Sequence, residues 1–443
     1  MRSPKKHLRF GSLIQAFRQH CASLQDKRQN GKIGYRLVDV ILSGFACLFF
    51  QDPSLLQFQK RMSEEKQRSN LTTLFAVEQI PENTQLREVL DDVKSESFRP
   101  VFKEYFARLQ RGKQLEPFAF LTVDGQKLYL VSIDGTQYFS SKRISCGQCL
   151  HREHKAGEKT YAHHALQGAL MHPQRRQVVP LMAEDIRNAD GQTKQDCEIN
   201  AAKRFLPALR SDHPQLGMII VGDSLFSKHP LVELTRDNNM HFIFVAKPGD
   251  HQYMMQTIAA RQEEVQELRM PQQDGKLFVY HWLNGVPLGA REDAFRVNYF
   301  ELEIYAPDKN GQLHRTYRCT WVTDLAVQKT TIAHLVQGAR CRWKVENECF
   351  NTLKNQGYHL AHNFGHGAQF LSFNLYLLTL LAFLCHQIFE LTDALYQTAR
   401  ERWAKRLLWE TLRSAIKFIL FVSWEQLLSH CLDPPDMHSS APA

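Results

Sequence analysis

The feature that most constrains the fold is a run of short apolar segments between residues 118 and 249, divided by turn residues. In chain order the segments are 120–141, 177–186, 197–214, 217–227 and 241–250. The first predicts two or three short strands separated by Asp-Gly turns, the second continues the sheet, and the third predicts a helix. The last two contain the apolar runs typical of buried parallel strands. This order predicts an α/β fold in which helices pack against a mixed sheet.

The pattern of apolar residues changes on either side of this segment. We expect a helical domain at 1–117, the first part of an α/β core at 118–249, a β-rich insertion at 250–328, completion of the core with further helices at 329–430, and a disordered polar tail at 431–443. Within the β-rich part, Asn284-Gly285 and Asn310-Gly311 are predicted hairpin turns.

The composition is that of a soluble globular protein with a polyanionic partner. Of the 443 residues 43% are hydrophobic and 23% are charged, which excludes a wholly disordered chain. The length favours two or three domains. The net charge of +9 fits a nucleic-acid partner, and the basic N-terminal helices are candidates for contacting DNA. A solvated basic helix face is the alternative interpretation of those residues.

Cysteine usage and hydropathy predict a cytoplasmic protein. The ten cysteines are scattered, and the N-terminus has no apolar core of a signal peptide. One uncharged run, from Gly367 to Phe389, is long enough to span a membrane. Because Asn374, His386 and other polar residues interrupt it, we predict a buried core helix and no contact with a membrane.

Three acidic residues stand where the predicted elements can bring carboxylates together. Asp134 follows an apolar strand, Asp223 comes directly after the most apolar strand, and Glu346 lies on a predicted helix. Phosphodiester cleavage commonly uses two divalent metals roughly 4 Å apart. Mg²⁺ prefers carboxylate oxygens. The competitor of Asp134 is Asp124, a second Asp-Gly, which we assign to a hairpin turn.

The motifs around these residues resemble the DDE transposases of bacterial insertion sequences, of the type with a Tyr–Arg–Glu–Lys helix. RWKVENECFNTLKNQGYHL resembles that helix, and IDGTQYFSS and VGDSLFS resemble the first and second acidic motifs. The similarity covers roughly Phe75 to His366. It implies a ribonuclease-H-like core with a β-strand insertion between the second Asp and the Glu. It also implies a catalytic triad of Asp134, Asp223 and Glu346 that holds two Mg²⁺ ions.

The family resemblance implies a DNA reaction. The protein would bind the terminal inverted repeats of its element and pair two ends as a homodimer. Each end would be cleaved to leave a 3′-hydroxyl, which then attacks target DNA. Two alternatives remain: another nuclease on the ribonuclease-H-like fold, and an inactive transposase-derived protein that only binds DNA.

The helix motif matches the family in part. Arg342 and Glu346 are four residues apart and should face the same side, so Arg342 would brace Glu346 or hold a DNA phosphate. The family Tyr position holds Ala339, and the family Lys position holds Leu353, with Lys354 next. On a regular helix that step turns the side chain by about 100°. Glu348 is a rival acid on another face of the helix.

Other residues are candidates for DNA contact. Trp282, in the β-rich segment, would stack on or flip a base, because some members of the family use an aromatic residue there. Packing of the indole in the core is the alternative. Lys247 and Lys228 lie in loops at the ends of core strands and are candidate phosphate ligands, with solvated charges as the alternative.

A group of cysteines and histidines follows the Asp134 strand. Cys146 and Cys149, with His151 and His154 just after them, predict a structural Zn²⁺ site. The compact spacing is unusual for such a site, and unligated loop residues are the alternative. A second pair, His163-His164, lies nearby in the sequence.

Overall fold

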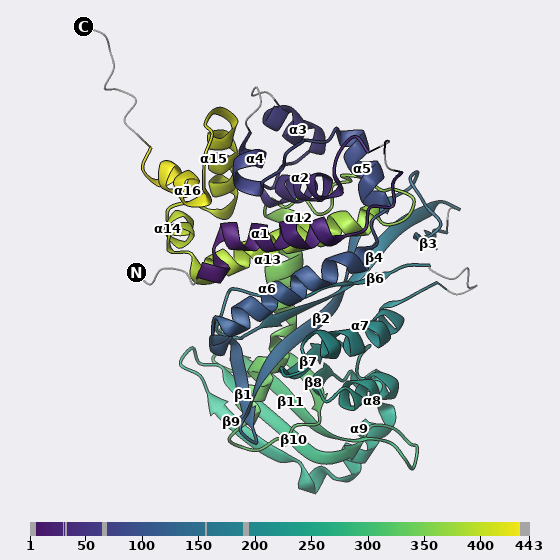
Figure 1. Ribbon diagram of the computed structural model, residues 1–443. Helices are drawn as coiled ribbons and strands as arrows, with labels where there is room; N and C mark the ends of the chain where they lie inside the picture. The colour runs from purple at the N-terminus through teal and green to yellow at the C-terminus, as the bar shows by residue number, and fades with distance from the viewer. Residues whose placement is uncertain are drawn as a thin grey trace.

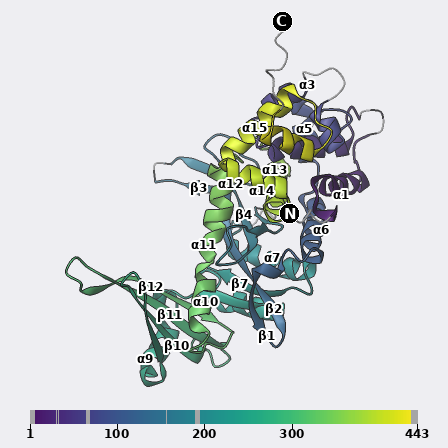
Figure 2. The ribbon, with the colours of Figure 1, turned by 90° about the vertical axis from the view of Figure 1, so that its left-hand side faces the viewer.

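The computed structural model describes residues 6–29, 31, 33–63, 69–155, 157–188 and 195–434. It has the predicted α/β architecture, in which twelve strands of the described residues form one mixed sheet (Figure 1). The order of the main strands across the sheet is β3-β4-β2-β7-β8-β12-β11-β10-β9. Helices gather above the sheet and along its faces (Figures 1 and 2).

Parallel strands form the centre of the sheet. β2 (Gln126–Ser141) pairs in parallel with β7 (Gly217–Gly222), and β7 pairs in parallel with β8 (His241–Val245). On its other side β2 pairs antiparallel with β4 (Lys159–Met171). Every residue of β7 is buried, as expected for a strand that helices cover on both faces. This pairing sets the end of β7 beside the middle of β2, and so determines which acidic residues of the two strands come together.

Short strands complete this part of the sheet. They are β1 (Ala119–Val123), which pairs with β2, and β3 (Leu150–Glu153), β5 (Val179–Pro180) and β6 (Glu184–Ile186), which pair with β4. Asp124 occupies the tight turn between β1 and β2 with a positive φ of 49°, a conformation that Asp tolerates. Its predicted role as a hairpin turn residue is confirmed. The helices α7 (Glu198–Asp212) and α8 (His229–Asp237) precede and follow β7.

The β-rich segment extends this sheet. Its strands are β9 (Gln266–Pro271), β10 (Leu277–Pro287), β11 (Arg296–Pro307) and β12 (Leu313–Thr323), all antiparallel. β12 pairs with β8, so hydrogen bonding continues without a break from the central strands. The segment also contains the helix α9 (Gln252–Ala260) and the single turns η4 (Pro248–Asp250) and η5 (Gln262–Glu264), which the strand-like pattern did not predict.

Only one of the two predicted Asn-Gly turns is a hairpin turn. Asn310-Gly311 lies in the turn between β11 and β12, as predicted. Asn284-Gly285 was wrongly assigned, because it lies inside β10. The β10–β11 register shifts between Leu283 and Val286, and Gly285 has a φ of +69°, so the dipeptide forms a β-bulge. The Asn284 amide donates to Val327 O, which ties this bulge to the chain beyond β12.

The helices outside the sheet pack around a single long helix, α13 (Leu371–Thr392). Those before the sheet are η1 (Lys6–Leu8), α1 (Phe10–Ser23), α2 (Leu37–Phe49), α3 (Leu55–Ser63), α4 (Asn70–Phe75), α5 (Asn83–Asp91), η2 (Ser95–Phe98), α6 (Arg99–Arg111) and η3 (Glu116–Phe118). Those after α13 are α14 (Ala394–Arg402), α15 (Lys405–Phe418) and α16 (Trp424–Leu432). Leu432 is thus helical, and 435–443 of the predicted tail lie outside the described residues.

Specific contacts join the first helices to α13. The Asn374 amide donates to the carbonyl oxygens of Leu90 and Val93, at 2.8 and 2.7 Å, and accepts from the Ser95 hydroxyl. The rings of Phe49 and His386 lie 4.6 Å apart. The helical part predicted at 1–117 therefore shares its core with the C-terminal helices, which its local sequence pattern could not indicate.

α13 is the predicted core helix. It has the length and apolarity of a membrane span, and 83% of its most apolar window is buried inside the protein. Its polar residues have partners in the interior. His386 Nδ1 is 2.6 Å from the Tyr358 hydroxyl, and Gln387 Oε1 accepts from Val178 N. The neighbouring helices thus supply the apolar environment that a membrane would otherwise provide.

Trp282 lies on β10 with 5% of its surface exposed. Its indole belongs to the hydrophobic core, so it has no free face for a DNA base, and the packing interpretation holds. We expect Trp282→Leu to lower the free energy of unfolding by about 1–3 kcal/mol, measured by chemical denaturation. DNA affinity of the folded variant should stay unchanged, whereas loss of a base-stacking residue would cost about 1–3 kcal/mol of binding.

Candidate active site

Asp134 and Asp223 stand at the same level of two adjacent parallel strands. Ser132 is the last residue of β2 in register with β7, opposite Val221. Two residues further along each strand are Asp134 and Asp223, so the register places them side by side where β7 ends. Asp223 Oδ1 accepts from Leu225 N at 2.8 Å, which holds the loop after β7. Asp134 itself lies within β2, because β2 continues beyond the end of β7.

Glu346 lies on a long helical rod that crosses β2. The rod consists of α10 (Ile332–Arg340), α11 (Arg342–Lys344), the π-helical turn η6 (Val345–Phe350) and α12 (Asn351–Asn355). It runs from the antiparallel strands to the helical part of the molecule (Figure 2). The Ser132 hydroxyl donates to Arg342 O at 3.2 Å, which fixes the rod against the strand two residues before Asp134.

Arg342 joins two of the three predicted catalytic acids. Its Nη1 donates to Glu346 Oε1 at 2.6 Å and to Asp134 Oδ2 at 3.1 Å. The predicted contact of Arg342 with Glu346 on one face of the helix is confirmed, and Asp134 is brought to the same guanidinium. Arg342 and Asp134 have 16% of their side chains exposed, and Glu346 has 45%. The arrangement is therefore open to solvent on the side of Glu346.

The electrostatics of Asp134 are those of a crowded acidic site. Burial is the main cause that raises the pKa of Asp134 to about 7, and the neighbouring Glu346 adds to it. The Arg342 guanidinium and the Gly135 amide act in the opposite direction. The Arg342 guanidinium thus does not fully offset the burial of Asp134 and the charge of Glu346, and additional positive charge at this site would stabilise the Asp134 carboxylate.

Glu198 is a fourth acid that the sequence patterns did not single out. It lies in the first turn of α7, and its carboxylate covers Gly135 so closely that any side chain there would collide with it. Burial and, second, the charge of Asp223 raise the pKa of Glu198. Glu198 therefore lies near both the Asp134 strand and Asp223. An acid at the start of a helix is ordinarily explained by the helix dipole, so the sequence offered no specific signal.

The π-helical turn accounts for the position of Lys354. In an α-helix each residue turns the chain by about 100°, so the seventh residue after Glu346 returns to the same face. A π turn closes i→i+5 hydrogen bonds and contains one residue more. The eighth residue, Lys354, therefore takes the place that the seventh has in a regular helix. Leu353 is fully buried, and the Lys354 ammonium lies 6.0 Å from the Phe350 ring centroid.

The other two positions of the helix are consistent with the sequence analysis. Ala339, at the position where the resembling transposases have Tyr, is 1% exposed and packs in the core. Glu348, the rival acid, lies within electrostatic range of a different cation. Burial lowers the pKa of Lys405 on α15, and the nearby charge of Glu348 opposes that shift. Among the described side chains, Glu348 makes no hydrogen bond or ion pair with Arg342 or Asp134.

The predicted phosphate ligands lie in loops beyond the ends of β7 and β8. Lys247 is exposed just after β8. Lys228 is 43% exposed, and its ammonium lies 4.0 Å from Asp250 Oδ1, so part of its charge is already balanced. A further aromatic residue, Trp343, follows Arg342 in the chain and is 56% exposed. Its indole is available to a ligand, in contrast to that of Trp282.

The cysteines and histidines come together in a different combination from the predicted one. Cys146 and Cys149 lie close to each other, as expected. His151 and His154 are exposed on and just after β3, where His154 Nε2 is 2.9 Å from the Thr160 hydroxyl. The histidines that approach the thiols are His163 of β4 and His366, which comes from far along the chain. Local spacing therefore identified the thiols but not their partners.

Comparison of the sequence with models of known protein families and with curated protein sequences finds no match. The functional assignment therefore depends on the arrangement of the chain's own residues. The acids on β2, after β7 and on the helical rod, together with Arg342, are the arrangement that has to be explained.

Proposed function

We propose that the protein is a DDE transposase, a metal-dependent enzyme that cleaves transposon ends and transfers the 3′-hydroxyl to target DNA. The observation that carries the proposal is the contact of one guanidinium, that of Arg342, with both Asp134 and Glu346. These two acids are 212 residues apart, and Asp223 is beside Asp134 by strand register. Convergence of acids from three separate elements is the requirement of two-metal phosphodiester chemistry.

The order of the elements supports the same proposal. Antiparallel strands β2, β4 and β6 are followed by α7 and then by the parallel strands β7 and β8. This is the strand, helix, strand order expected of a ribonuclease-H-like core. The strands β9–β12 fall between Asp223 and Glu346, the interval in which the resembling transposases have a β-strand insertion.

The donor set fits Mg²⁺. Asp134, Asp223 and Glu346 offer carboxylate oxygens, the ligands that Mg²⁺ prefers, and no thiol or imidazole is among them. Burial and, second, the neighbouring Glu346 raise the pKa of Asp134, so a bound cation would stabilise its carboxylate. Mg²⁺ bound by these residues would activate the attacking oxygen and stabilise the leaving oxygen of the phosphodiester. Glu198 is placed to hold or orient a ligand of the same site.

The remaining residues position the DNA. Lys354 lies on the same rod as Glu346 and is a cation for a backbone phosphate. Trp343 offers an exposed ring for a base, and Lys247 an exposed ammonium beyond the β8 end of the sheet. With a net charge of +9 the chain is suited to double-stranded DNA, in which two end-bound copies form the paired complex.

The test is cleavage of the element's own ends. The inverted repeats are identified in the DNA on either side of the gene, and a labelled duplex that carries one repeat is incubated with the full-length protein and Mg²⁺. We expect a nick at the repeat boundary with a 3′-hydroxyl, detected by extension with a polymerase on a denaturing gel. Ca²⁺ or EDTA in place of Mg²⁺, and a duplex with a scrambled repeat, are the controls.

Two outcomes would contradict the proposal. Specific binding of the repeat without any nick, in Mg²⁺ and in Mn²⁺, would identify a DNA-binding protein that has lost catalysis. Cleavage of branched or RNA–DNA hybrid substrates with no preference for the repeat would identify another nuclease on a similar fold. A plasmid excision assay in cells, with the flanking DNA supplied, makes the same distinction.

A further inference from the structure

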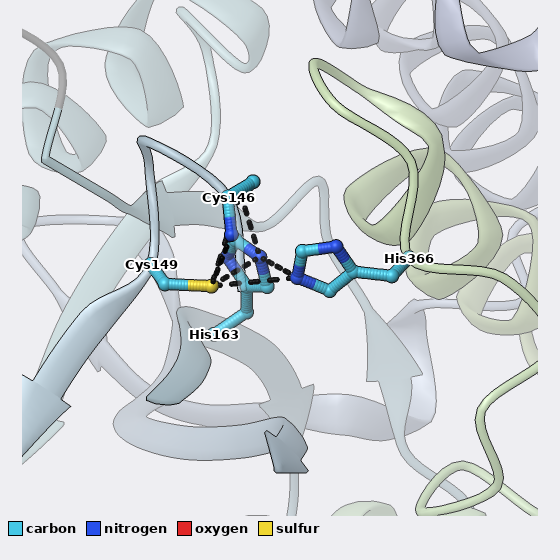
Figure 3. Close-up of side chains that lie close together, drawn as sticks. All are labelled: Cys146, Cys149, His163 and His366. Carbon is cyan, nitrogen blue, oxygen red and sulfur yellow. Dashed lines mark hydrogen bonds between the residues drawn. The ribbon is translucent and has the colours of Figure 1, made fainter. Parts of the chain in front are cut away.

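Two thiols and two imidazoles converge in a cluster that includes none of the acids of the candidate active site (Figure 3). Cys146 and Cys149 come from the loop between β2 and β3, His163 from β4, and His366 from the segment between α12 and α13. One donor atom of each lies within 4.8 Å of all the others. Cys149 and His163 are each 4% exposed, so the cluster is largely shielded from solvent. The cysteines are free thiols.

The distances between the donor atoms are those of a tetrahedron around zinc. With Zn–S of about 2.3 Å and Zn–N of about 2.05 Å, the tetrahedral edges are about 3.8 Å for S–S, 3.5 Å for S–N and 3.3 Å for N–N. The observed Sγ–Sγ distance between Cys146 and Cys149 is 3.8 Å. The Nε2–Nε2 distance between His163 and His366 is 3.2 Å.

The mixed edges agree as well. Nε2 of His163 lies 3.6 Å from Cys146 Sγ and 3.4 Å from Cys149 Sγ. Nε2 of His366 lies 3.4 Å from Cys149 Sγ. A disulfide would require an S–S separation of about 2.0 Å and would leave the imidazoles without a role. All five distances therefore fit four ligands of one ion.

The imidazole of His366 is oriented for metal binding. Its Nδ1 lies 2.9 Å from Gly367 O, so the Nδ1–H donates to the carbonyl. The lone pair of Nε2 is therefore available to a metal ion. This hydrogen bond to a backbone carbonyl is the usual support of a metal-bound histidine. Asp91 of α5 fixes the same segment, because its carboxylate accepts from the amides of Ala368 to Leu371.

We propose that Cys146, Cys149, His163 and His366 bind one Zn²⁺ in a closed structural site. Four protein ligands leave no open position, so the ion is not catalytic. The site would join the hairpin of β2 and β4, which carries Asp134, to the segment that follows the Glu346 rod. His366 is 217 residues from Cys149, so the ion closes a very long loop of the chain. Zinc binding here does not depend on the proposed DNA reaction.

The second cluster of possible ligands does not support a similar proposal. His281, Glu301 and Glu303 also lie close together on β10 and β11. Their carboxylates already have partners: Arg315 Nη1 lies 2.5 Å from Glu303 Oε1, and the Arg318 guanidinium pairs with Glu301. An ion pair network therefore explains that cluster without a metal.

Metal analysis of the full-length protein tests the proposal. The protein is purified without added chelator and without a histidine tag, and zinc is measured by mass spectrometry. We expect about one Zn²⁺ per chain for the natural protein, and a loss of at least about 80% of it in Cys146→Ser and His366→Ala, the loss of one of four ligands. His154→Ala and Cys197→Ser are matched controls that should retain the ion. Circular dichroism establishes that each variant is folded.

Cobalt substitution provides a second, spectroscopic measurement. Replacement of the ion by Co²⁺ should give the visible bands of tetrahedral cobalt with thiolate charge transfer, and His366→Cys should keep the ion with a changed spectrum. Absence of zinc and of cobalt binding in the folded natural protein would overturn the proposal. Full zinc content in folded His366→Ala, or its loss in His154→Ala, would overturn the ligand assignment. Neither result depends on whether the protein cleaves DNA.

Discussion

Replacing Glu346 by glutamine is expected to lower Mg²⁺-dependent nicking of the cognate end by about 10²–10³-fold or more, the loss that removal of one preorganised charge-stabilising group produces. The amide has nearly the shape of the carboxylate but no charge, so a metal ligand is lost while packing is retained. Arg342 loses one of its two charged partners, and Asp134 remains as the other. Cleavage is measured in single-turnover reactions, and end binding by mobility shift.

Glu348→Gln is the matched control for this prediction. It makes the same chemical change two residues further along the rod, on a side chain that, among the described residues, makes no ion pair with Arg342. We expect nearly unchanged nicking from this variant. Equal activity of Glu346→Gln and the natural protein would remove Glu346 from the active site. A loss in Glu348→Gln alone would transfer the role to the rival acid. Binding of the end should be similar in all three proteins.

The acidic site was accessible from the sequence because its position depends on strand ends and helix spacing. Asp223 follows a strand that is apolar throughout, so its place at the carboxyl end of a central strand could be predicted. The four-residue spacing of Arg342 and Glu346 predicted their contact. Asp134 was separated from Asp124 by resemblance to the family, and the turn conformation of Asp124 agrees with that choice.

Features that depend on tertiary contacts could not be predicted in the same way. Spacing favoured His151 and His154 as partners of the thiols, since they are next in the chain. His366 approaches Cys149 only because the segment before α13 folds back over the β2–β4 hairpin. The approach of Glu198 to Gly135 likewise depends on how α7 crosses the sheet.

Irregular backbone geometry is a second feature that the sequence patterns could not predict. Asn-Gly is the strongest local signal for a hairpin, yet at 284–285 the chain uses it for a bulge, because β10 continues to pair with β11 on both sides. A prediction that assumes one fixed number of residues per helical turn cannot detect the π turn in the rod. Each irregularity adds one residue to an element, and each changes the face on which the following side chains lie.

The π turn has a consequence that mutation can measure. Leu353 is fully buried and Lys354 is partly exposed, although a regular helix would place residue 353 on the face of Glu346. We expect Leu353→Ala to lower the free energy of unfolding by about 2–5 kcal/mol, the range for a buried leucine. The DNA affinity of the folded variant, and its dependence on salt, should not change. Chemical denaturation and DNA titrations at several salt concentrations measure both quantities.

Lys354→Ala should give the complementary result. Its loss removes one phosphate contact, so DNA binding weakens for every sequence and the slope of log K against log salt decreases by about 1. Its stability should change by no more than about 0.5 kcal/mol, because the side chain is not in the core. A Lys354→Ala protein with an unchanged salt slope would exclude the lysine from the DNA interface. A reduced slope in Leu353→Ala would instead mean that the helix in solution lacks the extra residue of the π turn.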